Sequence, residues 1–319
     1  MNYFQDILNA QKRIEPFVTE TPVVTSNALN SMFGAEIFFK LENKQEAGAF
    51  KFRGATNAVQ NLSEEEAAKG VATHSSGNHA AALALAAKNR GIPAYIVMPE
   101  NTPQIKVENV KRFGGQITFC KPTLEAREEE LKQVIEKTGA IFIPPYDYYD
   151  VICGQGTAAL ELIEQAGPFD IVMAPVGGGG LLSGSAIATR KLLPNAQIIA
   201  GEPANADDAC RSLKAGKIIP SNNPDTIADG LKTSLGENNF KIIHEFVDHI
   251  FTAKEESIRA AMVLLRKQAG IFAEPSSAVP LAAMAENKEY FRGKRIGVII
   301  SGGNISEETF SMLTYYQND

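Results

Sequence analysis

Three short turns rich in glycine, serine and asparagine carry residue types that can bind anions. The segment Gly177-Gly178-Gly179-Gly180-Leu181 places four residues without Cβ at the predicted start of a helix, where successive backbone N–H groups can hold a phosphate. Ser76-Gly77-Asn78-His79 offers hydroxyl, amide and backbone donors, which suit a smaller anion such as a carboxylate. Ser301-Gly302-Gly303-Asn304 is a third polar turn. One such turn is a weak indication because glycine is common in tight turns, but three that each follow a predicted strand favour a binding site.

Lys51 is the candidate nucleophile of the sequence. It lies between two phenylalanines in the segment AGAFKFRGA. Most lysines are solvated surface charges, and a lysine is rarely buried without a function. An apolar setting destabilises the ammonium form and frees the amine to form a Schiff base with an aldehyde.

Two other functions fit parts of the same pattern. The turn after Val176 nearly matches a dinucleotide-binding fingerprint, and Glu202 ends the next predicted strand, where an acid would bind a ribose hydroxyl. However, Ser183 takes the place of the third glycine, and a nicotinamide-dependent oxidoreductase would leave Lys51 without a role. A non-catalytic amino-acid sensor could use the same anion-binding turns. Visible absorbance separates the three hypotheses, because a Schiff base between a lysine and its cofactor colours the protein.

The elements that position these residues alternate along the chain. We predict apolar strands at residues 70–75, 93–98, 116–120, 170–176, 196–201 and 294–300, and helices that include residues 78–89 and 255–268. Strands this apolar, separated by helices, indicate an α/β protein with a parallel sheet covered on both faces. Ligands bind at the carboxyl ends of strands in such sheets, which is where the three polar turns lie.

Composition narrows the partners that we expect. The 319 residues carry a net charge of -6 and are 44% hydrophobic, so we expect an ordinary globular protein that acts on a small molecule rather than on nucleic acid or a membrane. The cysteines Cys120, Cys153 and Cys210 form no CxxC pair, which suits buried thiols in a reducing compartment. The N-terminal residues show no signal-peptide pattern, and we expect a cytoplasmic location.

Eight motifs occur in the same order as in the serine racemases and the short serine/threonine dehydratases. They are AFKFRGA, HSSGNH, GQGTAALE, PVGGGGLLSG, EPANADD, TIADGLKTS, AEPSSA and SGGN, and the resemblance extends from Thr21-Pro22 to Asn304. The chain thus resembles the fold-type II, tryptophan synthase β-like, pyridoxal-phosphate enzymes. The resemblance implies a large α/β domain of residues 1–69 and 148–319, and a small mobile domain of residues 70–147 that closes over the substrate. Each would contain a mainly parallel sheet flanked by helices, and we expect a homodimer.

The resemblance also assigns roles to individual residues. The cofactor, pyridoxal 5'-phosphate, would be held by Lys51 as the covalent link, Phe50 against the ring, Asn78 at the ring hydroxyl, Gly177, Gly178, Gly179, Gly180 and Leu181 at the phosphate, and Ser301 at the pyridine nitrogen. The substrate carboxylate would be held by Ser75, Ser76, Asn78 and His79. Arg127 aligns with a residue that reaches the substrate on closure, although an exposed helix arginine paired with neighbouring glutamates is an equal alternative.

The implied reaction starts with removal of the Cα proton by the Lys51 amine, because the cofactor acts as an electron sink. A hydroxyl on Cβ can then leave, so serine would give pyruvate and ammonia, and threonine 2-oxobutyrate. In this family Ser76 lies on the cofactor face opposite Lys51 and can supply a proton there, which racemisation requires. Serine, threonine and 3-hydroxyaspartate all stay open as preferred substrates, and so does the ratio of elimination to racemisation.

The EPANADD motif holds a divalent cation in this family. The implied ligands are the acids Glu202 and Asp208 and the backbone carbonyl of Ala206, with water completing a shell that suits Mg²⁺, Mn²⁺ or Ca²⁺. A solvated acidic loop is the alternative interpretation of the same residues.

Some features depart from the family pattern. Animal serine racemases bind ATP at the dimer interface and carry Lys-Thr where this chain has Glu46-Ala47, and they carry a tyrosine at the position of Phe113. A glutamate repels a triphosphate, so we expect little response to ATP. The chain ends shortly after Asn304, and we do not expect the C-terminal regulatory domain of biosynthetic threonine dehydratases.

Overall fold

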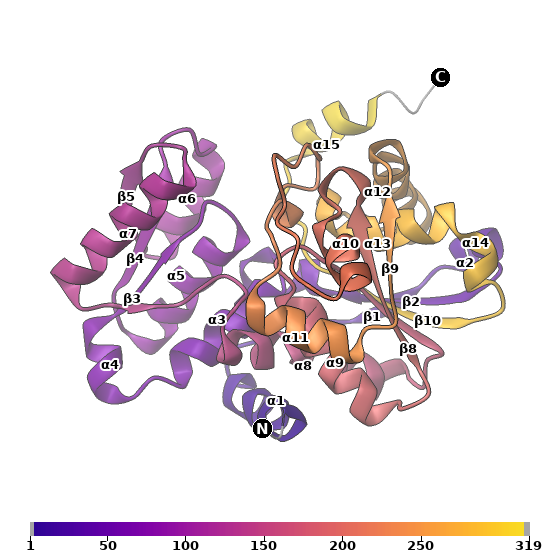
Figure 1. Cartoon of the computed structure of the whole chain (residues 1–319), viewed down its shortest axis with the longest axis horizontal. Helices are drawn as coiled ribbons and strands as arrows, with labels where there is room; N and C mark the ends of the chain where they lie inside the picture. The colour runs from indigo at the N-terminus through magenta and orange to yellow at the C-terminus, as the bar shows by residue number, and fades with distance from the viewer. Residues whose placement is uncertain (1–2, 316–319) are drawn as a thin grey trace.

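Two sheets organise the chain, one of six strands and one of four. The computed structural model describes residues 3–315. Figure 1 shows the four-stranded sheet and its helices as the left part of the molecule, and the six-stranded sheet with its helices as the right part. The chain is therefore an α/β protein with two layered units, as the sequence predicts.

The six-stranded sheet has the order β1-β2-β10-β7-β8-β9. Its strands are β1 (Val23–Thr25), β2 (Glu36–Leu41), β7 (Ile171–Pro175), β8 (Gln197–Pro203), β9 (His249–Ala253) and β10 (Arg295–Ile300). All neighbours pair in parallel except β1, which pairs antiparallel with β2 at one edge. Every residue of β7 is buried, as expected for a central strand with helices on both faces.

The four-stranded sheet has the order β5-β4-β3-β6, with all neighbours parallel. Its strands are β3 (Val71–His74), β4 (Ala94–Pro99), β5 (Gln116–Cys120) and β6 (Ile141–Phe142). They all fall inside residues 70–147, the segment predicted to be the small domain. The exact domain boundaries stay a prediction.

Helices cover both sheets, and short 3₁₀ turns connect several of them. The helices are α1 (Tyr3–Ile14), α2 (Asn27–Phe33), α3 (Lys51–Gln60), α4 (Glu64–Lys69), α5 (Asn78–Arg90), α6 (Gln104–Arg112), α7 (Leu124–Thr138), α8 (Tyr149–Ala166), α9 (Gly180–Leu192), α10 (Asp208–Ala215), α11 (Glu237–Phe246), α12 (Glu255–Ala269), α13 (Pro275–Glu286), α14 (Lys288–Phe291) and α15 (Glu307–Thr314). The 3₁₀ turns are η1 (Glu42–Lys44), η2 (Glu46–Gly48), η3 (Ala204–Ala206) and η4 (Asp229–Leu231). No helix among residues 3–315 is long and apolar enough to cross a membrane.

The six predicted strands are confirmed, each with ends within two residues of the predicted ones. The cysteines are buried free thiols, also as predicted. Strands β1, β2, β6 and β9 lie outside the predicted set. β1 and β6 are very short, and β2 contains a fully buried charge, Lys40, which interrupts its apolar pattern.

Helix α3 joins the two units. It packs against α5 of the four-stranded unit and against α8, which covers the six-stranded sheet. Gly54 permits the second contact, because a Cβ there would lie 2.8 Å from the backbone oxygen of Val151. Figure 1 shows α3 between the two sheets, and the candidate nucleophile Lys51 is the first residue of this helix.

Candidate active site

Lys51 lies at the start of α3 with its side chain only partly exposed. Its Nζ donates a hydrogen bond of 2.5 Å to the backbone oxygen of Pro145 and lies 5.1 Å from the ring centroid of Phe50 and 5.9 Å from that of Tyr146. The loss of water around the amine lowers the pKa of Lys51 to about 8, although the charge of Glu274 opposes this shift. A substantial fraction of the amine is therefore neutral near physiological pH, as the apolar flanking residues predict.

The glycine-rich turn between β7 and α9 is shaped for an anion. A Cβ on Gly178 would lie 2.4 Å from the ring of Tyr146, and Gly179 has φ +95, so both positions favour glycine. Asn239 holds the turn by donating a 2.9 Å hydrogen bond to the backbone oxygen of Gly178. Helix α9 begins at Gly180, and the first N–H groups of a helix have no partner inside the helix. They can therefore bind a phosphate at this end of α9.

The other two polar turns meet beside Lys51. The N–H of Phe50 donates to the backbone oxygen of Ser301 at 2.9 Å, which connects the lysine segment to the turn after β10. The side-chain amide of Asn304 in that turn donates to Oδ1 of Asn78 at 2.8 Å. The structure thus brings Lys51, Asn78 and Ser301 together from two sheets.

Glu274 is a site residue that sequence reasoning did not single out. Its carboxylate accepts a 2.8 Å hydrogen bond from Nδ2 of Asn78 and one of 3.2 Å from the N–H of Asn304. Burial raises the pKa of Glu274 to about 7, and the charge of Asp229 adds to this shift while Asn78 opposes it. The acid directly before Pro275 in the AEPSSA motif was the available signal.

Ser301 is buried, and its hydroxyl lies 2.9 Å from that of Ser277. The Ser277 hydroxyl also donates to the backbone oxygen of Gly302 at 2.7 Å. This pair of neutral hydroxyls fixes the orientation of the Ser301 side chain.

The turn between β3 and α5 positions the predicted carboxylate site. The Ser75 hydroxyl accepts the N–H of Gly77 at 3.3 Å, and Ser76 is partly buried beside it. The imidazole of His79 is buried, with Nε2 2.9 Å from the backbone oxygen of Ile143, and burial lowers its pKa to about 3. Its side chain therefore serves the packing of α5, and only its backbone N–H can face an anion.

Arg127 lies apart from these turns, in the first turn of α7. Its Nε donates to the backbone oxygen of Thr123 at 3.3 Å. Burial lowers the pKa of His74, at the end of β3, and the charge of Arg127 contributes to that shift. Arg127 is therefore near the carboxyl end of β3 but makes no hydrogen bond with Ser75, Ser76 or Asn78 in the described structure.

The acids of the EPANADD motif lie together between β8 and α10. Glu202 is fully buried, and its two oxygens accept the N–H groups of Ala209 and Cys210, each at 2.8 Å. Burial raises the pKa of Glu202 to about 8, and nearby Asp208 adds to the shift. Oδ1 of Asp208 is buried with no hydrogen-bond partner in the described structure.

This donor set fits a cation better than it fits a ribose. Two close acids repel each other, and an unpartnered carboxylate oxygen can accept a hard cation. Because no group of three or more acidic, histidine or cysteine side chains within residues 3–315 could hold a metal, a backbone oxygen such as that of Ala206 would have to complete the site. Each oxygen of Glu202 accepts one N–H at the start of α10 and keeps a second lone pair, which a cation could take.

Known proteins resemble this chain over nearly its full length. A family model described as "Pyridoxal-phosphate dependent enzyme" matches residues 14–302. The chain is 51% identical over 302 residues to the beta-hydroxyaspartate dehydratase of Paracoccus denitrificans, and the match covers 95% of this chain and 96% of that protein. It is 48% identical over 313 residues to the serine racemase of Arabidopsis thaliana, covering 95% of this chain and 94% of that protein.

A solved structure agrees with these sequence matches. The structure of maize serine racemase has a TM-score of 0.94 and 45% sequence identity to this chain, covering 98% of this chain and 97% of that one. The family match favours a pyridoxal-phosphate enzyme over the nicotinamide-dependent oxidoreductase and the amino-acid sensor. The chain belongs to the fold-type II pyridoxal-phosphate-dependent enzymes.

Proposed function

We propose that this chain catalyses the β-elimination of water from hydroxy amino acids of the L-serine and L-threonine type, giving a keto acid and ammonia, with racemisation of serine as a second activity. The observation that carries the proposal is the position of Lys51, whose pKa of about 8 leaves a reactive amine where the three polar turns converge. The relatives named serine racemase and beta-hydroxyaspartate dehydratase support the same chemistry.

The cofactor site would be formed by the residues around Lys51. We assign the covalent link to Lys51, the ring contact to Phe50, the ring hydroxyl to Asn78, the phosphate to Gly177–Leu181 and the ring nitrogen to Ser301. Pyridoxal phosphate, when bound, withdraws electrons from the substrate and makes its Cα–H bond acidic. The Ser301 hydroxyl is neutral, so it would stabilise a charge on the ring nitrogen less than a carboxylate would.

The protein's own groups would then move protons. The Lys51 amine is a suitable general base, because a group with a pKa near the working pH is both deprotonated and basic. Ser75, Ser76 and the backbone N–H groups of Asn78 and His79 would bind the substrate carboxylate at the start of α5. Ser76 would provide or remove a proton on the face opposite Lys51, which is the additional step that racemisation needs.

We infer that residues 70–147 act as the mobile small domain. Two ion pairs among the described residues connect this segment with the rest of the chain, one between Lys106 on α6 and Asp229 at 2.7 Å and one between Arg90 on α5 and Glu64 at 2.9 Å. Closure over the substrate would bring Arg127 of the same segment closer to the substrate.

A divalent cation at Glu202, Ala206 and Asp208 belongs to the proposal as a structural component. Mg²⁺, Mn²⁺ or Ca²⁺ would take the unpartnered oxygen of Asp208 and brace the loop that packs near the glycine-rich turn. A homodimer and a cytoplasmic location stay predictions from the sequence.

The decisive experiment separates the substrates and the two activities. The purified protein, loaded with cofactor, is incubated with each enantiomer of serine and threonine and with 3-hydroxyaspartate, and both keto acid and the opposite enantiomer are quantified. The proposal expects keto acid from at least one L-hydroxy amino acid. A coloured protein that forms neither product from any of them would overturn it.

A further inference from the structure

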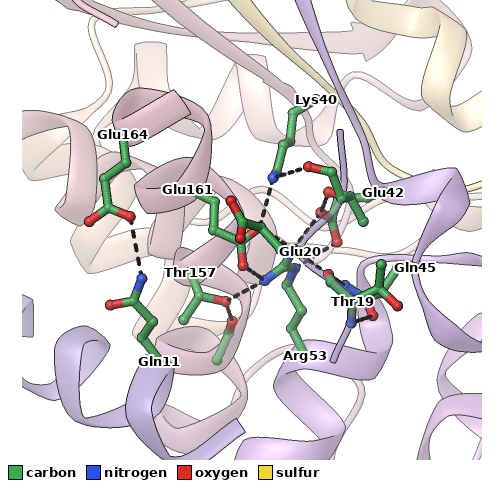
Figure 2. Close-up of polar contacts among 12 residues, drawn as sticks. Gln11, Thr19, Glu20, Lys40, Glu42, Gln45, Arg53, Thr157, Glu161 and Glu164 are labelled. Atoms are coloured by element: carbon green, nitrogen blue, oxygen red, sulfur yellow. Dashed lines mark hydrogen bonds and ion pairs between the residues drawn. The ribbon is translucent and has the colours of Figure 1, made fainter. Parts of the chain in front are cut away.

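Four charged side chains form a buried cluster beside α3: Lys40 on β2, Glu42 in η1, Arg53 on α3 and Glu161 on α8 (Figure 2). Lys40, Glu42 and Arg53 are 0% exposed and Glu161 is 8% exposed. Burying ions is costly unless each is paired and hydrogen-bonded, and replacing such a cluster by apolar residues often costs no stability. A role other than stability is therefore worth seeking for these residues.

Arg53 makes a two-point contact with Glu42. Its Nε donates to Oε2 of Glu42 at 2.7 Å, and its Nη2 donates to Oε1 at 2.9 Å. Glu42 opens the segment that leads from β2 into α3, and Arg53 lies two residues after Lys51. The pair therefore closes a loop, residues 42–53, that carries Lys51.

The backbone of that loop includes an unfavourable conformation. Ala47 has φ 58, in the left-handed region that a residue with Cβ rarely adopts, and Gly48 follows with φ 75. A conformation of this kind persists only where the surroundings fix it. Asn304 holds the middle of the loop by donating to the backbone oxygen of Ala47 at 2.8 Å, and the forked contact between Arg53 and Glu42 fixes its two ends.

The same guanidinium also connects the loop to α8. Nη1 of Arg53 donates to Oε1 of Glu161 at 2.6 Å, and Nη2 donates to Oε2 at 2.7 Å. Helix α8 begins shortly after Pro145, whose backbone oxygen accepts the hydrogen bond from the Lys51 amine. One planar, five-donor group thus connects the loop that carries Lys51 to α8, the helix that follows the Pro145 segment.

We propose that Arg53 is a positioning residue for Lys51, which holds the amine at its working place by clamping Glu42 on one side and Glu161 on the other. The inference rests on the proposed role of Lys51 as the cofactor-binding amine. The two positive and two negative charges of the cluster balance. We therefore expect Arg53 to act on Lys51 through the geometry of its contacts rather than through a net charge.

Lys40 offers a matched control inside the same cluster. Its Nζ contacts Glu161 at 2.6 Å and the backbone oxygen of Thr21 at 2.6 Å. In the described structure it donates no hydrogen bond to residues 42–53, and it interacts with Arg53 and Glu42 only through their charges. Lys40→Met should lower the melting temperature without moving Lys51. Arg53→Lys keeps the charge and loses the two-point contacts.

The experiment compares the two variants with wild type as holoenzymes and as apoenzymes given pyridoxal phosphate. For Arg53→Lys we expect kcat to fall by about tenfold to a hundredfold, the scale of a misplaced catalytic group. We also expect slower recovery of the visible absorbance of the bound cofactor and a shifted pH profile of kcat. Lys40→Met, at a similar loss in melting temperature, should keep kcat within about twofold of wild type.

Glu42→Gln is the second test, should Arg53→Lys fold poorly, because it keeps the shape of the contact and weakens it. It should reproduce the slower cofactor recovery. Equal losses of kcat in the Lys40 and Arg53 variants, or unchanged cofactor recovery and pH profile in both Arg53→Lys and Glu42→Gln, would overturn the inference. A wild-type protein that binds no cofactor through Lys51 would instead overturn the proposed function.

Discussion

The side-chain amide of Asn78 donates a 2.8 Å hydrogen bond to the buried carboxylate of Glu274, although 196 residues separate the two in sequence. Asn78 begins α5 of the four-stranded unit, and Glu274 directly precedes α13 of the six-stranded unit. The contact therefore joins the two units at the site. Sequence reasoning did not single out Glu274. In the structure its surroundings raise its pKa to about 7.

Glu274→Gln should stabilise the apoenzyme relative to wild type, and this gain should be larger at pH 8 than at pH 5. Burial raises the pKa of Glu274 from its ordinary 4.5 to about 7, so wild type loses stability as pH rises through this range, while glutamine has no charge to bury. The difference in unfolding free energy should reach about 1–3 kcal/mol, the size expected for a shift of this kind. Denaturant unfolding at both pH values measures it, and a difference that does not change with pH would contradict the assigned pKa.

Gly178→Ala should weaken both folding and cofactor binding. Its Cβ would enter the ring of Tyr146, and overpacking of this kind costs about 1–3 kcal/mol. Gly77→Ala is the control for stability, because a Cβ there meets open space. The melting temperature and the affinity for pyridoxal phosphate are measured for both variants. Equal melting temperatures would show that the Tyr146 ring can move away from the new Cβ without loss of stability.

Ser76→Ala should separate the two activities. In elimination of an L-substrate, Lys51 takes the Cα proton and the hydroxyl leaves, so a donor on the opposite face is not obligatory. Racemisation needs that donor, and the Cα proton of D-serine points toward Ser76. We therefore expect loss of racemisation and of D-serine elimination, with measurable elimination of L-serine or L-threonine.

The Ser76→Ala assay requires cofactor occupancy to be matched to wild type. Equal loss of all activities at full occupancy would mean that Ser76 mainly positions the carboxylate. Retained racemisation would mean that another group supplies the second proton.

Removal of divalent cations by chelator and dialysis should lower melting temperature and activity together. A cation that binds only the folded loop at Glu202 and Asp208 stabilises the protein by mass action, so Mg²⁺ or Mn²⁺ should restore both. Elemental analysis before and after dialysis gives the occupancy. An unchanged melting temperature in a protein that holds no metal would mean that these buried acids bind no cation and are held by their backbone hydrogen bonds alone.

Local patterns predicted much of this structure, and long-range contacts explain what they missed. The strand-ending turns at Ser76, Gly177 and Ser301 could be read from the sequence because apolar strands and glycine-rich turns are local signals. The apolar flanks of Lys51 correctly predicted its lowered pKa. The role of Glu274 depends on Asn78 and Asn304, and the direction of the His79 side chain depends on Ile143, so neither follows from neighbouring residues.

The central claim is that the Lys51 amine binds the cofactor and moves the Cα proton. The most direct measurement compares the visible absorbance and the turnover of wild type with those of Lys51→Ala and Lys51→Arg after each is incubated with pyridoxal phosphate and dialysed. Wild type should stay coloured and form keto acid, while both variants should lose the covalently held cofactor and all detectable turnover, because neither side chain offers a free amine. A Lys51→Ala protein that stays coloured and active would contradict the account.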